Sequence, residues 1–219
     1  MIFKMQTWIT FPNATFLKLI GIQCNSANVY DVGFVLDVSG SIGRSGWEIE
    51  KTFTKKLARV IDISPSGGRA GVVLFNSYAY MRIKFNTHNT YTAFAGGVDR
   101  LPFTGGGTSI TWGLKIALSQ LFQASAGMRT NSYKEVVLIT DGRDWGSTDY
   151  DSIARQYRSR GIKIIIIGVG SVDQRNLRKL VANSKDFYIA NNFQQLDSFA
   201  ENVGQTICNG MYKIFCNWL

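Results

Sequence analysis

The sequence predicts an α/β fold with a doubly wound, Rossmann-like sheet that is mostly parallel, has one antiparallel edge strand and carries helices on both faces. Apolar runs of strand length alternate along the chain with segments whose apolar residues recur at helical spacing. That alternation is typical of a parallel sheet covered on both faces. Two of the runs end in acidic residues, and α/β sheets place their ligand groups at the carboxyl ends of strands. The 219 residues are enough for one such domain with short extensions.

Two apolar patterns indicate the first strand and the first helix. The run Val32 to Leu36 has no charged or strongly polar residue, as in a parallel strand buried on both faces, so we expect a strand over Val29 to Asp37. Ser64 to Gly68, rich in turn residues, would end the helix that follows. That helix is predicted by apolar residues at helical spacing, namely Ile49, Phe53, Leu57, Val60 and Ile61.

A hairpin and two helices come next. Arg69 to Phe75 and Tyr80 to Phe85 are expected to pair through a turn at Asn76-Ser77, which makes the second of them the antiparallel edge strand. A short helix is expected over Thr90 to Val98. The helix expected after Thr108 is predicted by one apolar stripe, formed by Leu114, Ala117, Leu118, Leu121 and Phe122.

The second half of the chain is expected to alternate three strands with three helices. The strands cover Lys134 to Thr140, Ile162 to Val169 and Phe187 to Ala190. The helices cover Tyr150 to Arg160, Asn176 to Ala182 and Gln194 to Ile207. The last helix has an apolar face made of Leu196, Phe199, Ala200, Val203 and Ile207. No internal repeat is visible, so we expect a single module.

Residues that could hold a metal ion follow the first predicted strand. Asp37-Val38-Ser39-Gly40-Ser41 places one carboxylate and two hydroxyls at alternate positions, so three oxygens can turn toward one point. Hard divalent cations such as Mg²⁺ prefer oxygen ligands of this kind. The pattern by itself is short enough to arise by chance.

Two further stretches bring similar groups to the same edge of the sheet. Thr108 follows three glycines, residues 105–107, whose backbone can turn sharply before the next helix. Asp141 follows the strand that ends at Thr140 and precedes a glycine. Five side chains from three loops are therefore expected to converge, namely Asp37, Ser39, Ser41, Thr108 and Asp141.

These five residues resemble, position for position and in chain order, the metal-ion-dependent adhesion site of von Willebrand factor type A domains. The resemblance runs from about Val29 to Cys208 and includes Gly71 to Phe75 and Ile164 to Gly170. The stretches T-G-G-G-T, I-T-D-G-R and I-I-G-V-G, with the flanking cysteines, are most similar to matrilins and the A domains of collagen type VI. The chain then divides into an N-terminal extension (1–28), the A domain (29–208) and a short tail (209–219).

The resemblance implies that the site holds Mg²⁺ or Mn²⁺. Ser39, Ser41 and Thr108 would ligate the ion directly or through water, and Asp37 and Asp141 would supply charge, often through bridging waters. Few direct carboxylate ligands would leave the ion able to bind an acidic side chain of a partner. The alternative is a domain that has lost its metal, in which Ser41 and Thr108 merely cap helices.

Three cysteines bear on the compartment. Cys24 lies shortly before the first strand and Cys208 ends the last helix, so both belong to the sheet edge away from the metal site. The extracellular relatives that the chain resembles place a disulfide there, which supports secretion. Two unpaired cysteines are the alternative. Cys216 is left over, either as a free thiol or as a link to another chain.

The chain is basic, with a formal net charge of +9. Such charge can attract polyanions with salt-dependent affinity. In an extracellular setting, sulfated glycosaminoglycans or acidic matrix proteins are the natural candidates, and an ordinary solvated helical face is the simpler interpretation. No nucleic-acid-binding module is recognised, so no nucleic-acid partner is expected. The residues that fall close together in the sequence are Arg155, Arg158, Arg160, Lys163, Arg175, Arg178 and Lys179.

Catalytic motifs are incomplete, so no enzymatic activity is expected. His88, the only histidine, has no acid or nucleophile placed beside it. Residues 168–171 lack the third glycine of a dinucleotide fingerprint, and the glycines at 105–107 lack the lysine of a phosphate loop. Phosphotransfer at Asp37 would need a second acid where Ser39 stands.

The N-terminal segment fits a secretory signal poorly. Lys4, Pro12 and Lys18 interrupt the apolar patches of residues 1–23, whereas a signal needs a clean apolar region of about 7–15 residues. A degenerate signal, an imperfect start and part of a longer protein are all compatible with it. No apolar run approaches the roughly 20 residues that span a bilayer.

The sequence therefore predicts a secreted, non-enzymatic adhesion module of the extracellular matrix, which binds a protein such as a collagen through its cation. Two alternatives stay open. One is a structural matrix component that assembles through surface contacts, with the ion incidental. The other is an intracellular A domain that works as an assembly scaffold.

Overall fold

The computed structural model describes residues 24, 28–142, 144 and 149–208. The expected signal segment (residues 1–23), the tail (209–219) and Cys216 lie outside the described residues. The described chain forms one six-stranded sheet, built from β1 (Tyr30–Asp37), β2 (Arg69–Phe75), β3 (Ala79–Ile83), β4 (Tyr133–Thr140), β5 (Ile162–Val169) and β6 (Phe187–Ala190).

The strand order is β3-β2-β1-β4-β5-β6, and all neighbours are parallel except β3, which runs antiparallel to β2 at the edge. This confirms the predicted doubly wound sheet with one antiparallel edge strand. β2 and β4 lie on either side of β1 and run parallel to it, so the carboxyl ends of these three strands lie next to one another. That shared edge is where polar loops can meet.

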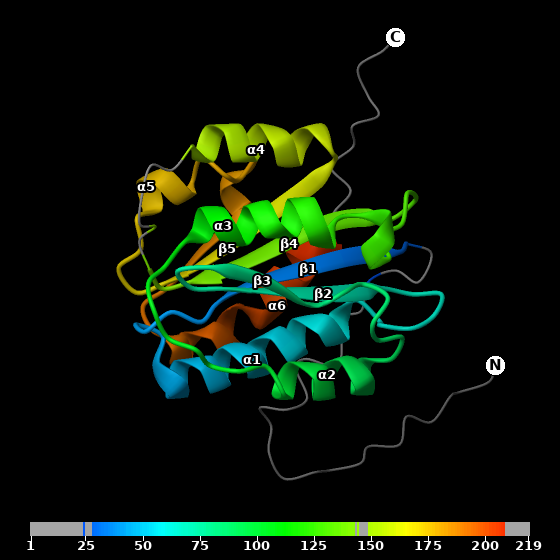
Figure 1. Cartoon of the computed structure of the whole chain (residues 1–219), viewed down its shortest axis with the longest axis horizontal. Coiled ribbons are helices and arrows are strands. Elements are labelled where there is room, and N and C mark those ends of the chain that lie inside the picture. The colour runs from blue at the N-terminus through cyan, green and yellow to red at the C-terminus, as the bar shows by residue number, and fades with distance from the viewer. Residues whose placement is uncertain (1–23, 25–27, 143, 145–148, 209–219) are drawn as a thin grey trace, which may run out of the picture.

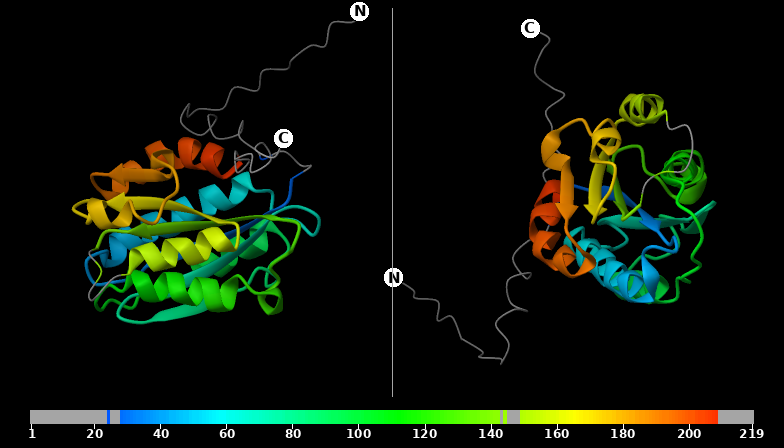
Figure 2. Two further views of the ribbon diagram at one scale, coloured as in Figure 1. Left: turned by 90° about the horizontal axis from the view of Figure 1, so that it is seen from above. Right: turned by 90° about the vertical axis from the view of Figure 1, so that its left-hand side faces the viewer.

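Six helices cover the two faces of the sheet (Figure 1). One face packs against α1 (Gly43–Val60), α2 (Tyr91–Asp99) and α6 (Leu196–Cys208), whose buried residues form a single cluster with those of β1 and β2. The other face packs against α3 (Ile110–Ile116), α4 (Tyr150–Ser159) and α5 (Gln174–Leu177). Figure 2 shows the sheet between these two layers. No described helix has the length and apolar composition needed to cross a bilayer.

Alternation within the strands distributes the core between the two faces. On β1, Phe34 and Leu36 belong to the cluster under α1 and α6, whereas Val35 belongs to the cluster under α3 and α4. All three are fully buried. The predicted apolar stripes of the helices after Thr108 and Gln194 are likewise directed inward, so periodicity alone predicted most of the core.

Three predicted elements differ from the structure. The helix expected after Thr108, whose apolar stripe reaches Phe122, is α-helical only to Ile116 and continues as a π-helix over Ala117–Leu121. The edge strand was expected over Tyr80 to Phe85 but covers Ala79–Ile83. The helix expected over Asn176 to Ala182 is instead the short α5, because the Asp173 side chain caps an earlier start by accepting from the Asn176 amide. After Leu177 the backbone hydrogen bonds change to a three-residue spacing, as in the bond from the Leu180 amide to the Leu177 carbonyl, and the α-helix ends.

Candidate metal site

The loops that carry the five predicted metal ligands meet at the carboxyl edge of the sheet. β1 and β4 are neighbours in parallel register, with Leu36 beside Ile139, so the two strands end side by side. The loop after β1 carries Ser39 and Ser41, and the loop before α3 reaches the same edge from below the sheet (Figure 1). Thus the topology brings together residues that are about 100 positions apart.

Asp37 is the fixed point of the site. It ends β1 and is fully buried. One carboxylate oxygen accepts a hydrogen bond from the Ser39 backbone amide (2.8 Å), and the other accepts one from the Thr140 hydroxyl (2.6 Å). Both carboxylate oxygens are therefore held in position by the loop and by β4. The sequence analysis did not single out Thr140, although a hydroxyl directly before Asp141 at a strand end was a usable signal.

The hydroxyl groups of the first loop are connected to Asp141. The Ser39 and Ser41 oxygens lie 3.1 Å apart, and the Ser41 hydroxyl donates to the Asp141 carboxylate at 2.8 Å. Ser39 is buried and Ser41 is exposed, so the row of oxygens leads from the interior to the surface. The predicted convergence of Asp37, Ser39, Ser41 and Asp141 is thus present in the geometry.

Thr108 joins the site through contact with Gly142. A Cβ atom added at Gly142 would lie 2.8 Å from the Thr108 methyl carbon and 2.9 Å from its hydroxyl oxygen, so only glycine leaves room for this approach. Thr108 is only 6% exposed, and its side chain makes no hydrogen bond to any residue that the structure describes. Its hydroxyl is therefore available as a ligand beside Asp141.

The glycine loop before Thr108 is held by the β2–β3 hairpin. Gly105 and Gly106 have φ angles of 67° and 99°, a region that favours glycine. The Asn76 side-chain amide donates to the Gly105 carbonyl at 2.8 Å, and the Gly40 amide donates to the Gly106 carbonyl at 2.8 Å. These bonds connect the first loop, the glycine loop and the hairpin into one rigid rim.

The site concentrates negative charge in a poorly solvated place. Burial raises the pKa of Asp37 to about 6, against the favourable hydrogen bonds from Ser39 and Thr140. Burial also raises the pKa of Asp141. Among the described residues, no lysine or arginine forms an ion pair with either carboxylate. A bound cation would supply the missing positive charge.

Glu50 adds a third carboxyl group that the sequence analysis missed. It lies on the buried face of α1, is fully buried, and neither of its carboxylate oxygens has a hydrogen-bond partner in the described structure. Burial, followed by the charges of Asp37 and Asp141, raises the pKa of Glu50 well above its usual range. Its position between Trp47 and Phe53 on the apolar stripe of α1 could have indicated from the sequence that Glu50 is buried.

The donor set fits a hard divalent cation. It consists of three hydroxyls and two carboxylates, and the described part of the chain contains no group of three or more His, Cys, Asp or Glu side chains that could hold a metal ion. Oxygen donors of this kind suit Mg²⁺ or Mn²⁺ better than metals that prefer imidazole or thiolate. The alternative role as helix caps finds no support, because α1 and α3 begin after Ile42 and Ser109, and neither the Ser41 nor the Thr108 hydroxyl accepts a hydrogen bond from a described helix amide. The first-turn amide of Thr111 in α3 donates to the Asp144 carboxylate instead.

The two predicted disulfide partners are joined at the opposite edge of the sheet. Cys24 is bonded to Cys208, the last residue of α6. The Tyr30 hydroxyl donates to the Cys208 carbonyl at 2.8 Å, and the Cys24 amide donates to the Val60 carbonyl at 3.0 Å. The disulfide therefore fixes the segment before β1 and the end of α6 to the same corner.

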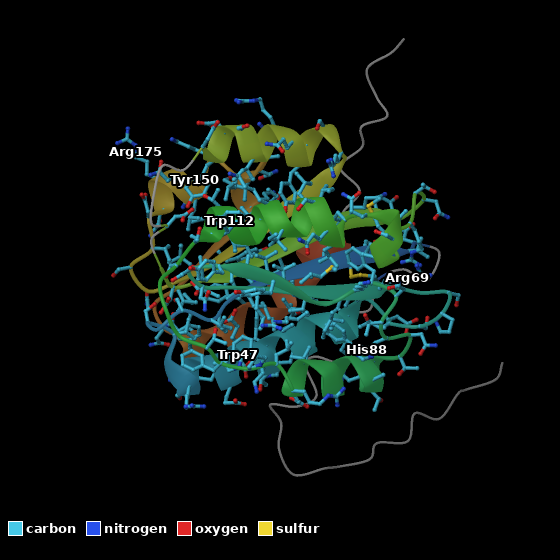
Figure 3. The ribbon with its side chains drawn as sticks, viewed as in Figure 1. Trp47, Arg69, His88, Trp112, Tyr150 and Arg175 are labelled. Atoms are coloured by element: carbon cyan, nitrogen blue, oxygen red, sulfur yellow. A yellow bond between two sulfur atoms is a disulfide. The ribbon has the colours of Figure 1, made fainter. Side chains whose placement is uncertain are left out.

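The seven basic residues divide into two groups. Arg155, Arg158 and Arg160 lie on or just after α4, and Arg175, Arg178 and Lys179 lie on or just after α5, all of them exposed. The two helices are neighbours, because the Lys179 ammonium lies 3.9 Å from the Asp151 carboxylate of α4. Figure 3 shows Arg175 on the outer side of α5.

Lys163 does not belong to that surface. Strand alternation on β5 directs it to the opposite face of the sheet, where its ammonium lies 3.3 Å from Asp186 and donates to the Thr206 carbonyl of α6 at 2.9 Å. The prediction that Lys163 shares a surface with the other six basic residues is therefore wrong. Successive side chains of a strand point to opposite faces of the sheet, and Lys163 points to the face that is covered by α6. His88 packs against Phe94 of α2, and Figure 3 places it away from the metal-site edge.

Comparisons with known proteins agree with this geometry. A family model for the von Willebrand factor type A domain matches residues 31–202. Matrilin-1 of Gallus gallus is 30% identical over 163 residues, which cover 73% of this chain and 32% of that protein. The collagen alpha-1(XII) chain of Notophthalmus viridescens is 26% identical over 193 residues, which cover 87% and 21%. The chain thus spans between a fifth and a third of these relatives.

Among solved structures, proximal thread matrix protein 1 from the mussel byssus is similar, with a TM-score of 0.78 and 25% identity over 84% of this chain and 47% of that one. In that structure zinc occupies the MIDAS motif, the metal-ion-dependent adhesion site. The similar proteins named here are components of extracellular matrix. With the family model covering most of the described residues, and with the fold and the loop arrangement described above, this chain belongs to the von Willebrand factor type A domain family.

Proposed function

We propose that the chain is an extracellular, non-enzymatic adhesion module that binds a matrix protein through a divalent cation, Mg²⁺ or Mn²⁺. The cation would be held by Asp37, Ser39, Ser41, Thr108 and Asp141. The A domain would cover residues 29–208, with extensions before and after it.

The observation that supports this proposal most is the row of oxygens from Asp37 through Ser39 and Ser41 to Asp141. The Asp37 carboxylate accepts from the Ser39 backbone amide, the Ser39 and Ser41 hydroxyl oxygens lie 3.1 Å apart, and the Ser41 hydroxyl donates to Asp141 at 2.8 Å. Burial raises the pKa values of both carboxylates. Such an arrangement repels itself unless a cation neutralises it. A bound cation would supply a Lewis-acidic position that accepts one more carboxylate.

The protein's own groups have separate parts in this scheme. The Asp37 carboxylate accepts hydrogen bonds from the Ser39 backbone amide and from the Thr140 hydroxyl, so it fixes the loop that carries the two serine ligands. Ser41 is exposed and lies at the surface end of the row, where a partner can approach. Because three of the five donors are neutral hydroxyls, the two carboxylates would no more than balance a divalent cation, so the bound cation could still accept an acidic residue from the partner.

The extracellular setting is supported by the disulfide and by the relatives. A disulfide such as Cys24–Cys208 persists in oxidising compartments and is rare in the cytosol. Matrilin-1 and the collagen alpha-1(XII) chain are matrix proteins, so a matrix protein, for example a collagen, is the proposed partner. A link from Cys216 to another chain stays a prediction.

A solid-phase binding assay tests the proposal. Wild-type protein should bind immobilised fibrillar collagen or whole matrix extract in Mg²⁺ and be released by a chelator. Asp37→Ala should not bind, whereas Asp151→Ala, which removes an exposed aspartate of α4, should bind like wild type. Equal binding by Asp37→Ala and wild type, with or without chelator, would contradict the proposed role of the cation.

A further inference from the structure

A groove of about 260 Å³ lies beside the metal site, between the β2–β3 hairpin and the segment that leads to the glycine loop. Val38 and Leu74, both buried, line it as an apolar floor, and Thr104 lines it from the segment before the glycine loop. Tyr78, Tyr80 and Arg82 line it from the hairpin and are called its near wall here. The groove follows β3, the edge strand at the front of the sheet in Figure 1.

The near wall presents aromatic and cationic side chains to the solvent. Tyr80 and Arg82 both line the groove, and the Arg82 guanidinium lies over the Tyr80 ring, so the two side chains lie on the same side of β3 although the pairing with β2 is irregular at Arg82. Tyr78 is 67% exposed and Tyr80 is 49% exposed. Their rings therefore offer a ligand two aromatic surfaces, each with a hydroxyl group.

Arg82 is held in place but lacks a carboxylate partner. Its guanidinium carbon lies 5.0 Å from the centre of the Tyr80 ring, so the ring supports it from one side. No carboxylate in the described part of the chain lies within ion-pairing distance of it. Arg82 is also the only charged residue among those that line the groove, so the groove is complementary to an acidic ligand.

The groove is continuous with the metal site. Val38, on its floor, stands between Asp37 and Ser39 in the sequence. Asn76 lines the groove, and its side-chain amide donates to the Thr104 hydroxyl at 3.0 Å and to the glycine loop. A ligand bound at the metal would reach the groove by passing over the exposed Gly106 of this loop.

We propose that the partner segment whose carboxylate reaches the metal site runs along this groove in an extended conformation, with a second acidic residue on Arg82. Apolar residues or prolines between the two acids would pack on Tyr78 and Tyr80, since extended and proline-rich segments dock on aromatic-lined grooves. This inference rests on the proposed function, because it assigns the partner of the same site.

The strand register gives the spacing of the two acids. Asp37 is level with Phe75 on β2, and Phe75 is level with Ala79 on β3. Two strand spacings of about 4.8 Å and three residues of about 3.3 Å along β3, whose register shifts at Arg82, place the Arg82 Cα atom roughly 14 Å from that of Asp37. An extended segment advances about 3.3 Å per residue, so the two acids should be about four residues apart.

Selection from a displayed library of random 12-residue peptides tests this inference. The full chain is immobilised in Mg²⁺, and only peptides released by a chelator are kept. We expect the selected peptides to carry two acidic residues about four positions apart. Synthetic copies should bind Arg82→Glu at least about ten-fold more weakly than wild type, as for loss of a charge-assisted contact, and Tyr80→Ala should also weaken binding.

Arg59→Glu is the matched control. Arg59 is exposed and its guanidinium carbon lies 4.6 Å from the Tyr91 ring centre, but it stands near the end of α1, away from the groove. This variant makes the same change of charge and should bind the peptides like wild type. Arg82→Gln removes the charge with a smaller perturbation, and thermal melting of each variant checks that the fold is intact.

The outcomes separate the inference from the function on which it rests. If chelator-released peptides bind Arg82→Glu and wild type equally, the groove is not used and the inference is overturned, while metal-dependent capture stands. If no chelator-released peptide is enriched, capture of a carboxylate by the cation is refuted, and the inference is refuted with it. Selected peptides with one acid and no dependence on Tyr80 would also overturn the inference.

Discussion

Removal of the Cys24–Cys208 disulfide should strongly destabilise the domain. The bond closes a loop with a sequence separation of 184 residues, from the segment before β1 to the last residue of α6. In the chain-entropy model, closure of a loop of this length stabilises the folded state by about 5 kcal/mol at 25 °C. Each kcal/mol moves the melting temperature of a domain of this size by about 2–4 °C. The double variant Cys24→Ala/Cys208→Ala should therefore melt about 10–20 °C below wild type.

Circular dichroism during thermal and urea unfolding measures this loss. Both proteins should carry Cys216→Ser, so that no new disulfide forms, and wild type should be purified in the oxidised state. The hydrogen bonds from Tyr30 to Cys208 and from Cys24 to Val60 involve backbone atoms of the cysteines and survive the substitution. A difference below about 1 kcal/mol in the free energy of unfolding would refute the reasoning.

Three further results are expected. Arg129→Met removes both guanidinium hydrogen bonds from the fully buried Asp31 and should lower the free energy of unfolding in urea by about 3–5 kcal/mol. The double variant Asp31→Asn/Arg129→Met should lose less than the sum of the two single variants. Additive losses would contradict this expectation. Burial raises the pKa of Glu135 from 4.5 to about 8, so the folded state keeps a proton that the unfolded chain loses, and the free energy of unfolding should fall as pH rises through this range. Glu135→Gln should flatten that decline, and parallel curves for the two proteins would contradict it. The double variant Arg155→Glu/Arg158→Glu should elute from a heparin column at a lower salt concentration than wild type. A control variant with two such charge reversals on the α1–α2 face should elute at a higher salt concentration than this variant. Elution of both variants at the same salt concentration would show that the α4–α5 surface has no special role.

The sequence predicted the convergence of Asp37, Ser39, Ser41 and Asp141 because the strand order of such a sheet brings their loops to one edge. Asp37 and Asp141 each follow a continuous apolar run, and parallel strands in such a sheet end at the same edge, so their convergence needed no knowledge of side-chain packing. The strand patterns were equally clear, since five consecutive apolar residues such as Val32 to Leu36 fit few other structures. Both are local signals with a fixed geometric consequence.

The errors and omissions share one physical cause, which is that they depend on contacts made in three dimensions. Glu50 lies on the apolar stripe of α1. A stripe with one glutamate still predicts a helix, and the pattern does not indicate that this glutamate lies near the charges of two aspartates. The start of α5 depends on the Asp173 cap, and its end on a change of hydrogen-bond spacing. Lys163 is an exception, because its position could have been predicted from the sequence. It is two and four residues from Ile165 and Ile167 on β5, so strand alternation places it on their face of the sheet, opposite α4.

The groove beside β3 was also beyond sequence reasoning. Tyr78, Tyr80 and Arg82 were assigned only to the edge strand and its turn, and no pattern indicated that they border the glycine loop. Their relation to the metal site depends on the Asn76 hydrogen bonds that join the hairpin to residues 104 and 105. Surfaces of this kind become visible only when the loops are in place.

The most direct test of the account is the melting temperature of wild type and Asp37→Ala, each in Mg²⁺ and in chelator. A cation present at about 100 times its dissociation constant stabilises the folded state by about 2.7 kcal/mol. For a domain of this size that amounts to about 5–10 °C. We expect such a shift for wild type and none for Asp37→Ala. Equal melting of wild type with and without Mg²⁺, or the same shift in both proteins, would contradict the claim that these residues hold the cation.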